Sequence, residues 1–265
     1  MKIGIVGAGR AGKGHGLALQ EAGHEVYLHG RRRADVPAPL VFSYGGQPPW
    51  LAEVGVIILA VQDHAIASAA AEAAEWGGVT RDHVVLHLSG ILDEAPLRVL
   101  EVTGAALGTM HPLQAMAAAE TAAERLIGAL AAITGDPRAT KAAREIAESL
   151  AMVPVVIDPK VKAKYHAAAV IASNYLVVLA AVAEQLMVEC GLDEETARRG
   201  LGRLMEGTLQ NVARAGPRQA LTGPVVRGDE ETLSKHREVL PPRVLELYRA
   251  LGAMAREMGR RDSRD

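Results

Sequence analysis

The chain opens with MKIGIVGAGRAG, residues 1–12, which joins a short apolar run to three glycines at G-x-G-x-x-G spacing. In this pattern Gly7 permits a tight turn, Gly9 lets a pyrophosphate approach the backbone, and Gly12 lets the following helix pack against the strand. The N-terminus of that helix supplies free amides and a positive dipole, both of which favour a phosphate. The sequence therefore predicts a dinucleotide site at this turn. The site comprises Gly7, Ala8, Gly9, Arg10, Ala11 and Gly12.

The residues after the second expected strand indicate which dinucleotide is bound. In an NAD site, an acidic residue about 20 positions after the glycines binds the ribose 2′-hydroxyl. No acid stands at the end of the strand at residues 25–29, and the chain continues with Gly30-Arg31-Arg32-Arg33. Guanidinium groups suit a 2′-phosphate, which they bind in a bidentate manner. We therefore expect NADP(H), bound by Arg31 and Arg32, although a solvated loop can have the same composition.

The composition is that of an ordinary globular protein. The chain has 265 residues, of which 49% are hydrophobic, and a formal net charge of -2. This charge gives no general attraction to nucleic acid or to an anionic membrane, so neither is expected as a partner. The single cysteine, Cys190, excludes an internal disulfide framework and disfavours a cysteine-based metal site. No secretory leader or membrane-spanning run is recognised in the sequence, so a cytoplasmic location is expected.

Short β-rich runs alternate with alanine-rich helical runs from residue 2 to residue 157. This alternation is typical of parallel βαβ units. Strands are expected at residues 3–6, 25–29, 40–43, 56–61, 84–88, 105–109, 129–133 and 153–157, with covering helices at 11–22, 64–76 and 137–150. The sequence thus predicts an α/β fold whose residues 1–157 form a doubly wound Rossmann domain that binds NADP.

A second, all-helical domain is expected at residues 158–265. Asp158 is a good N-cap, Pro159 is a good first helical residue, and no further proline or glycine occurs before Gly191. One long helix of about thirty residues is therefore predicted. It is too apolar around its circumference for the surface of a monomer, so we expect packing against other helices and a homodimer. Shorter helices are expected near 193–214, 217–221, 229–238 and 241–258, followed by a disordered tail at 259–265.

Four further segments resemble those of a known family. They are LHLSG (86–90), GTMHPLQ (108–114), YHAAAVIASN (165–174) and LTGPVVRGD (221–229). Together they resemble Rossmann-like proteins whose C-terminal domain is of unknown function. A Rossmann half followed by a helical half with one long helix also resembles the 6-phosphogluconate dehydrogenase-like superfamily, which includes ketopantoate, pyrroline-5-carboxylate and β-hydroxyacid oxidoreductases and prephenate dehydrogenases. The resemblance implies an NADP-dependent oxidoreductase, with ketopantoate reductase as one relative.

In such enzymes the nicotinamide lies at the carboxyl ends of the strands and the substrate enters between the two domains. Val61 and Gln62, which follow the fourth strand, are expected to contact the cofactor, and Asp63 is expected to cap the next helix. Ser89 follows the fifth strand and is expected to hydrogen-bond the carboxamide or the substrate. A turn before Gly90 would favour the same small residue.

The long helix is where the superfamily carries its proton donor, a lysine followed by an asparagine. Here His166 and Asn174 are eight residues apart, which on one continuous helix places them on one face, with Ser173 alongside. Histidine has a reference pKa of about 6.5, which suits proton donation at neutral pH. We expect His166 to donate the proton and Asn174 to orient the carbonyl.

Ketopantoate reductases carry the pattern Lys-x-x-x-Asn-x-x-x-Asn on this helix. The present sequence departs from that pattern, because Val170 stands in place of the middle polar residue. Lys162 and Lys164 remain rival proton donors, and both are expected to be more exposed than His166.

Substrate-binding candidates come from two other motifs. His111 resembles the His-Pro element of prephenate dehydrogenase-like proteins and is expected to face the substrate. Thr222 and Arg227 lie in a loop that enters a helix, where the arginine could hold a substrate carboxylate and Asp229 could cap the helix. The pair His83 and His87 lies on a strand, where i, i+4 spacing does not bring side chains together, so no metal site is expected.

These residues favour an NADPH-dependent reductase that delivers hydride to the carbonyl or imine carbon of a small carboxylate substrate, such as a 2-oxo acid. One alternative is an oxidative dehydrogenase of the prephenate kind, favoured by the His-Pro element. A second alternative is a non-catalytic protein that binds NADP(H) as a sensor, in which the helical half serves assembly.

Overall fold

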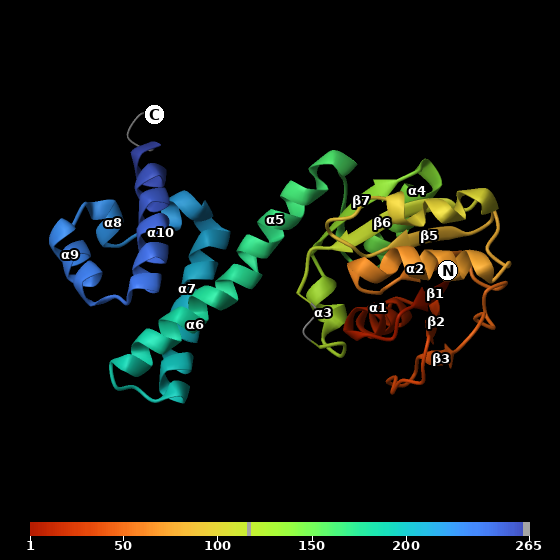
Figure 1. The fold of residues 1–265 in the computed structure, drawn as a ribbon, viewed down its shortest axis with the longest axis horizontal. Coiled ribbons are helices and arrows are strands. Elements are labelled where there is room, and N and C mark those ends of the chain that lie inside the picture. Colours follow the sequence, from red (N-terminus) through yellow and green to blue (C-terminus); the bar gives the residue numbers. More distant parts are fainter. Residues whose placement is uncertain (116–117, 262–265) are drawn as a thin grey trace. The chain divides into compact units, whose positions relative to one another are not determined.

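The computed structural model describes residues 1–115 and 118–261, and the side chains of residues up to 259. Residues 2–156 contain one eight-stranded sheet with the strand order β3-β2-β1-β4-β5-β6-β7-β8. Figure 1 shows this sheet with helices packed around it. The strands are β1 (Lys2–Val6), β2 (Glu25–Gly30), β3 (Val41–Tyr44), β4 (Val56–Leu59), β5 (Val84–His87), β6 (Ala106–Pro112), β7 (Leu130–Gly135) and β8 (Val153–Val156). All eight predicted strands are present, with ends that differ from the predictions by up to three residues.

One strand pair departs from the predicted parallel arrangement. β6 and β7 pair antiparallel, whereas all other neighbours in the sheet are parallel. The reason lies in the connection between them: the short helix α3 (Ala122–Leu126) packs on α1, and Leu113 N donates to Leu130 O at 2.7 Å. The chain therefore enters β7 at the edge of the sheet where β6 ends, without crossing back.

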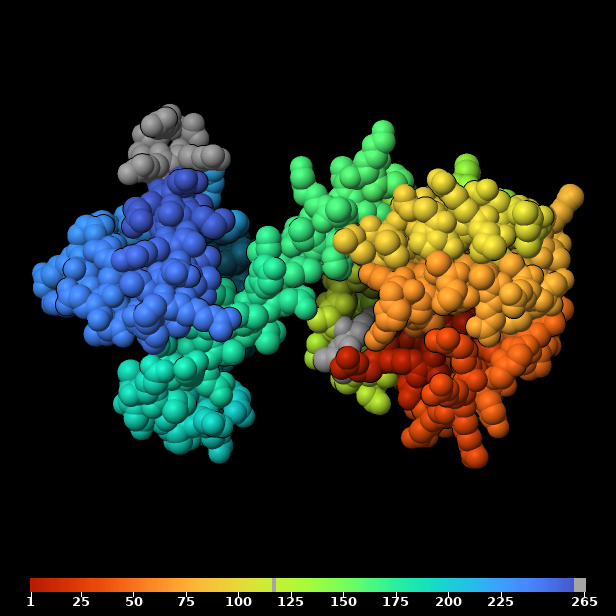
Figure 2. All heavy atoms as spheres, viewed as in Figure 1, coloured from red at the N-terminus to blue at the C-terminus, as the bar shows by residue number. Residues whose placement is uncertain are grey.

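Helices cover both faces of the sheet, as the sequence predicts for a doubly wound fold. One apolar cluster joins the sheet to α1 (Arg10–Glu21) and α4 (Pro137–Ser149), through residues such as Leu19 and Ile146. The other joins it to α2 (Asp63–Glu75) and the 3-10 helix η1 (Ala95–Thr103), through residues such as Ile66 and Leu97. Figure 2 shows α2 in orange and η1 in yellow, side by side on the outer surface.

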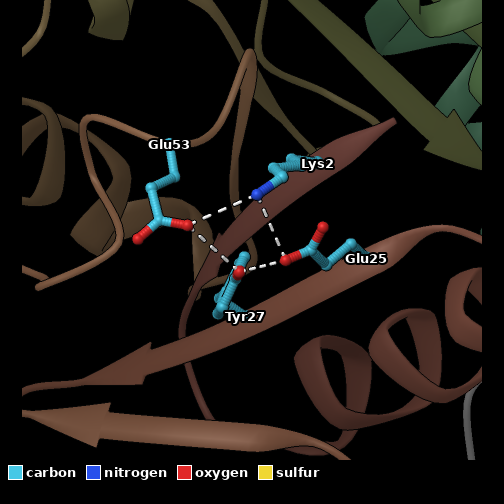
Figure 3. Close-up of polar contacts among 4 residues, drawn as sticks. All are labelled: Lys2, Glu25, Tyr27 and Glu53. Carbon is cyan, nitrogen blue, oxygen red and sulfur yellow. Dashed lines mark hydrogen bonds and ion pairs between the residues drawn. The ribbon is translucent and has the colours of Figure 1, made fainter.

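The amino edge of the sheet carries a polar network on its surface (Figure 3). Lys2 Nζ lies 3.3 Å from Glu25 Oε1 and 3.4 Å from Glu53 Oε2, and the Tyr27 hydroxyl donates to Glu25. Lys2 and Glu25 are direct partners in the β1–β2 register. These exposed ion pairs join the strands at the edge of the sheet opposite to the glycine-rich turn, which follows the carboxyl end of β1.

The predicted long helix is present over Pro159–Glu189, and it is irregular at one residue. After the short 3-10 turn η2 (Pro159–Val161), α5 (Lys162–Ala172) and α6 (Asn174–Glu189) are separated at Ser173, where φ is -115° and ψ is -71°. No proline or glycine marks this break in the sequence. Serine and asparagine have weak helix preference because their side chains compete for backbone groups, and this pair stands at the break.

The contacts divide the chain into two compact units, residues 1–173 and residues 174–265. The predicted boundary after residue 157 lies one helix earlier. The difference arises because α5 belongs to the first unit, to which Lys162 and Tyr165 are hydrogen-bonded. The predicted functions of the two halves, cofactor binding and substrate binding, remain predictions.

The second unit is helical, as predicted. Its further helices are α7 (Glu194–Ala220), α8 (Pro224–Arg227), α9 (Glu230–Val239) and α10 (Pro242–Arg261). α7 contains both of the helices predicted at 193–214 and 217–221, with a kink at Gly216 (φ 79°) and Pro217. α10 continues to Arg261, so residues 259–261 are helical and not part of a disordered tail. The rest of that predicted tail, residues 262–265, lies outside the described residues.

The surface of α6 is strongly apolar. Within the single chain, α6 contains no buried residue, and Val177 and Val178 are 68% and 53% exposed. The segment Pro159–Glu189 has a mean hydropathy of 1.8 in its most apolar window and is long enough to cross a membrane. That criterion uses length and composition only, and the core helices of soluble proteins also meet it.

Candidate functional site

The glycine-rich turn has the geometry that the motif predicts. Gly7 has a φ of 122°, and a Cβ on it would lie 2.4 Å from the carbonyl oxygen of Ala60. A Cβ on Gly12 would lie 1.8 Å from the carbonyl oxygen of Gly7. A Cβ on Gly9, in contrast, would meet no atom within 4 Å. Gly7 and Gly12 are therefore required by the fold, whereas Gly9 leaves open space.

That open space lies at the N-terminus of α1. Gly9 is the N-cap residue and provides no side-chain cap, so within the described part of the chain no side chain caps the first amides of the helix. Ala8, Arg10 and Ala11 complete the turn. Such a helix N-terminus, next to the open space at Gly9, fits a dinucleotide phosphate.

A cavity of about 560 Å³ extends from this turn. It is lined by Val6, Gly7, Ala8, Gly30, Arg31, Arg32, Arg33, Ala34, Val61, Ala65, Ser68, Ala69 and Glu72. The structure thus brings the predicted arginines and Val61 together with the glycine turn, and adds Arg33. Gln62 is exposed and is not among the residues that line the cavity. It is the N-cap residue of α2, whereas Asp63, the predicted cap, is the first residue of that helix.

Two side chains of this cavity were not identified from the sequence. Ser68 and Glu72 are one turn apart on α2 and so face the cavity together. Glu72 places a carboxylate in a cavity whose other charged lining residues are three arginines. The i, i+4 spacing of two polar residues in an alanine-rich helix was the signal in the sequence.

A second cluster is built around Lys162, at the carboxyl ends of β5 and β6. The prediction that Lys162 is exposed is wrong: its side chain is 1% exposed, whereas Lys164 is exposed as expected. Lys162 Nζ donates to the carbonyl oxygen of Ser89 at 3.1 Å and to Thr109 Oγ1 at 2.8 Å. These acceptors come from distant parts of the chain, so sequence reasoning on one helix could not anticipate the burial.

The charge of Lys162 is held in an apolar environment. Burial lowers its pKa from 10.5 to about 8, while the carboxylates of Glu94, Asp93 and Asp63 oppose this shift. An ammonium group has three hydrogens, and two have acceptors among the described residues. One N–H therefore remains without an acceptor among these residues. In a buried group, a hydrogen bond that is not made costs free energy, so this N–H favours the binding of another acceptor.

His111, Tyr165 and His166 stand beside this lysine. His111 Nδ1 lies 3.0 Å from the Tyr165 hydroxyl, and its ring centroid lies 6.0 Å from that of His166. A Cβ on Gly90 would lie 2.6 Å from His166 Cδ2 and 2.8 Å from His111 Nε2, so both imidazoles lie close to the backbone of this turn. Burial, followed by the charges of Lys162 and His166, lowers the pKa of His111 to about 4. His111 is therefore neutral at pH 7.

Ser89 serves the turn before Gly90. Its side-chain oxygen accepts from the amides of Ile91 at 3.3 Å and Leu92 at 3.1 Å, and the residue is 5% exposed. The hydroxyl of Ser89 therefore stabilises the turn before Gly90, which is the structural alternative that the sequence offered. The carbonyl oxygen of Ser89 accepts a hydrogen bond from Lys162. The predicted contact of Ser89 with cofactor or substrate remains a prediction.

The two strand histidines have structural partners. His87 Nε2 lies 2.7 Å from the carbonyl oxygen of Asp93, and His83 Nε2 lies 3.1 Å from that of Leu51. Among the residues that the structure describes, no group of three or more His, Cys, Asp or Glu has the geometry of a metal site.

The remaining candidates lie at or beyond the break after α5. Ser173 and Asn174 are exposed, and they stand at the irregular residue that separates α5 from α6. That Asn174 shares a face with His166 remains a prediction. Thr222 precedes α8 and Arg227 ends it, and both are exposed. Asp229 caps α9 as expected, since its side chain accepts from Thr232 N at 3.1 Å.

Comparison with known proteins finds solved structures with the same Rossmann-type architecture. Residues 129–255 match the model of a family described as a domain of unknown function, DUF2520. No curated protein matches the chain. A solved protein from Thermotoga maritima shares 24% identity and a TM-score of 0.75, with 99% of this chain and 100% of that chain covered.

Two further solved structures carry descriptions of activity. A Bacteroides fragilis protein provisionally named as an NADP oxidoreductase shares 22% identity and a TM-score of 0.74, covering 97% and 98% of the two chains. Pyrroline carboxylate reductase from Plasmodium falciparum, solved with NADP bound, shares 14% identity and a TM-score of 0.65, covering 98% of each chain. At these identities the comparisons confirm the predicted fold class. The narrower superfamily assignment remains a prediction.

Proposed function

We propose that this protein is an NADP(H)-dependent reductase that delivers hydride to the carbonyl or imine carbon of a small carboxylate substrate. The observation that carries the proposal is the position of Lys162, a buried ammonium group with one N–H to spare, at the carboxyl ends of β5 and β6. In doubly wound folds this edge of the sheet is where ligands bind. A proton donor there is what reduction of a carbonyl or imine requires.

The cofactor would be held by the glycine turn and the adjoining cavity. The amides at the start of α1 would bind the pyrophosphate at Gly9, and Arg31 and Arg32, with Arg33, would bind the 2′-phosphate. When bound, the nicotinamide supplies the hydride. The choice of NADP(H) over NAD(H) rests on the arginines of this cavity.

Lys162 is the preferred proton donor. A donor is most effective when its pKa lies close to the working pH, and burial brings that of Lys162 to about 8. His166, the donor favoured by the sequence, is half-buried beside the same turn and is the second candidate. His111 is neutral at pH 7, so its ring can hydrogen-bond a substrate without adding a positive charge next to Lys162.

The proposal also includes the other residues that the sequence assigned to the site. Ser173, Asn174, Thr222 and Arg227 are proposed substrate contacts. The apolar surface of α6 supports the proposal of a homodimer, because large apolar surfaces seldom remain exposed in solution. A cytoplasmic location without membrane or nucleic-acid partners is also proposed.

Fluorescence titration with NADPH and NADH tests the cofactor assignment. Loss of a charge-assisted contact costs about 1.5–3 kcal/mol, so Arg31→Ala with Arg32→Ala should weaken NADPH binding by roughly 10- to 100-fold. NADH binding should change little, and Arg144→Ala on α4, which is exposed, provides a matched control. Absence of binding of either dinucleotide to the wild-type chain would overturn the proposal. Oxidation of NADPH by 2-oxo acids and cyclic imines then tests the reaction.

A further inference from the structure

A chain of hydroxyl groups leads away from Lys162 through the sheet. Lys162 Nζ donates to Thr109 Oγ1 at 2.8 Å, and Thr109 Oγ1 lies 2.9 Å from Thr134 Oγ1. Thr109 and Thr134 are direct partners in the antiparallel β6–β7 pair and are 0% and 1% exposed. The three polar groups therefore form one continuous buried chain.

The hydrogen positions in this chain follow from its first member. An ammonium group can only donate, so Thr109 Oγ1 accepts from Lys162. The hydrogen of Thr109 is then directed to its other neighbour, Thr134 Oγ1. The hydroxyl of Thr134 is left to donate onward, and the described residues offer it no further acceptor.

Thr134 lines a second cavity, of about 430 Å³, which is separate from the one at the glycine turn. Glu94, Arg98 and Asp136 are also in its wall. Glu94 Oε1 is buried and has no hydrogen-bond partner among the described residues. The same carboxylate is the charge that most favours the protonated form of Lys162. This cavity has room for water, and its wall contains both the outer end of the chain, Thr134, and an acceptor without a partner, Glu94.

We infer that Thr109 and Thr134 form a proton path by which Lys162 is reprotonated from the cavity at Glu94. The inference rests on the proposed role of Lys162 as proton donor. After Lys162 has given one proton to the substrate oxygen or nitrogen, its neutral amine can accept a hydrogen bond, so the two hydroxyls rotate until Thr109 donates to Lys162 Nζ and Thr134 donates to Thr109. The amine then takes the proton of Thr109, Thr109 takes that of Thr134, and Thr134 takes one from water in the cavity, which regains a proton from the solvent. One proton moves inward, and no bond between heavy atoms changes. Thr109 and Thr134 act through Lys162 and are positioning residues.

The test is the hydrogen-exchange rate of the Lys162 ammonium group in the full chain, measured by NMR on protein labelled with ¹⁵N-lysine. Lys162→Arg removes and so assigns the signal. Thr134→Val, which keeps the shape and removes the hydroxyl, should slow exchange by roughly tenfold or more, the factor for loss of one hydrogen bond. Thr134→Ser, which keeps the hydroxyl, should exchange as wild type does. Exchange in Thr134→Val at the wild-type rate would overturn the path.

Activity measurements on the same variants separate this inference from the proposed function. Suppose that the wild-type chain oxidises NADPH, that Lys162→Arg does not, and that the exchange rate is equal in Thr134→Val and wild type. The proton path is then wrong, and the proposed reductase function is supported. If exchange is slowed but no 2-oxo acid or imine is reduced, the path connects Lys162 to solvent and the reductase proposal is wrong. If both hold, Thr134→Val should also lower steady-state turnover more than Thr134→Ser does.

Discussion

Lys162 donates a hydrogen bond to the carbonyl oxygen of Ser89, 73 residues earlier in the chain, at 3.1 Å. This bond ties the first turn of α5 to the turn after β5. It also explains why α5 belongs to the first compact unit. The position of a charged group inside this unit leads to the first prediction.

Activity should depend on the protonation of Lys162. Because the donor must be protonated and its pKa is about 8, the turnover number for reduction should fall as the pH rises through 8. Lys162→Met should lower turnover by about 10²- to 10⁴-fold, the usual contribution of a general acid. Lys164→Met, on the exposed side of the same helix, is the control. Turnover that survives in Lys162→Met but is lost in His166→Gln would assign the proton to His166 instead.

The stability of the fold should decrease in mild acid because of His111. Its pKa is about 4 in the folded chain and 6.5 in the reference state, so between these values the unfolded chain binds a proton that the folded chain does not. The free energy of unfolding should therefore fall as the pH drops from 6.5 to 4, by up to about 3 kcal/mol. Urea denaturation across this range should show a shallower decline in His111→Phe. His64→Gln, which changes an exposed histidine, should keep the wild-type slope.

Two glycines of the first turn should respond differently to the same substitution. Gly12→Ala places a Cβ 1.8 Å from a backbone oxygen, so it should destabilise the fold by about 1–3 kcal/mol or more. Gly9→Ala meets no atom within 4 Å, and its φ of -80° suits alanine, so the fold should be retained. The new methyl group would occupy the space proposed for the pyrophosphate. Thermal unfolding and dinucleotide titration should separate the two effects, and equal loss of stability would contradict this account.

Removal of the Glu72 carboxylate should strengthen the binding of NADPH. Glu72 lines the cavity that contains the three arginines, where its charge opposes that of a 2′-phosphate. Glu72→Gln should tighten NADPH binding by roughly threefold, a change of the size expected for an exposed charge pair, and leave NADH binding nearly as it is. Glu75→Gln, an exposed change on the same helix, is the control. Equal effects on both dinucleotides would show that Glu72 does not face the 2′-phosphate.

The proposed homodimer can be tested on α6. Val177 and Val178 are exposed in the single chain, and a charged side chain there could not be buried without cost. Val178→Asp should shift the chain from dimer to monomer in sedimentation velocity. A wild-type chain that sediments as a monomer at micromolar concentration would rule out the dimer.

The sequence by itself determined the secondary-structure elements and the glycine-rich turn after β1. Strand positions follow from apolar runs that are buried on both faces, and the glycine spacing fixes a local backbone geometry, so the β1 turn, both helix layers and the arginine cluster could be predicted from short segments. The antiparallel β7 could not be predicted, because strand direction depends on where a connection packs.

Only the tertiary structure decided the chemistry around Lys162. Its acceptors, Ser89 and Thr109, lie 73 and 53 residues away, and its burial and lowered pKa come from packing that no local pattern encodes. The irregular residue Ser173 in the long helix could not be predicted either, because helix preference is weak compared with tertiary contacts. Local geometry is set by neighbouring residues, whereas the environment of a charge is set by whichever distant segments the fold brings to it.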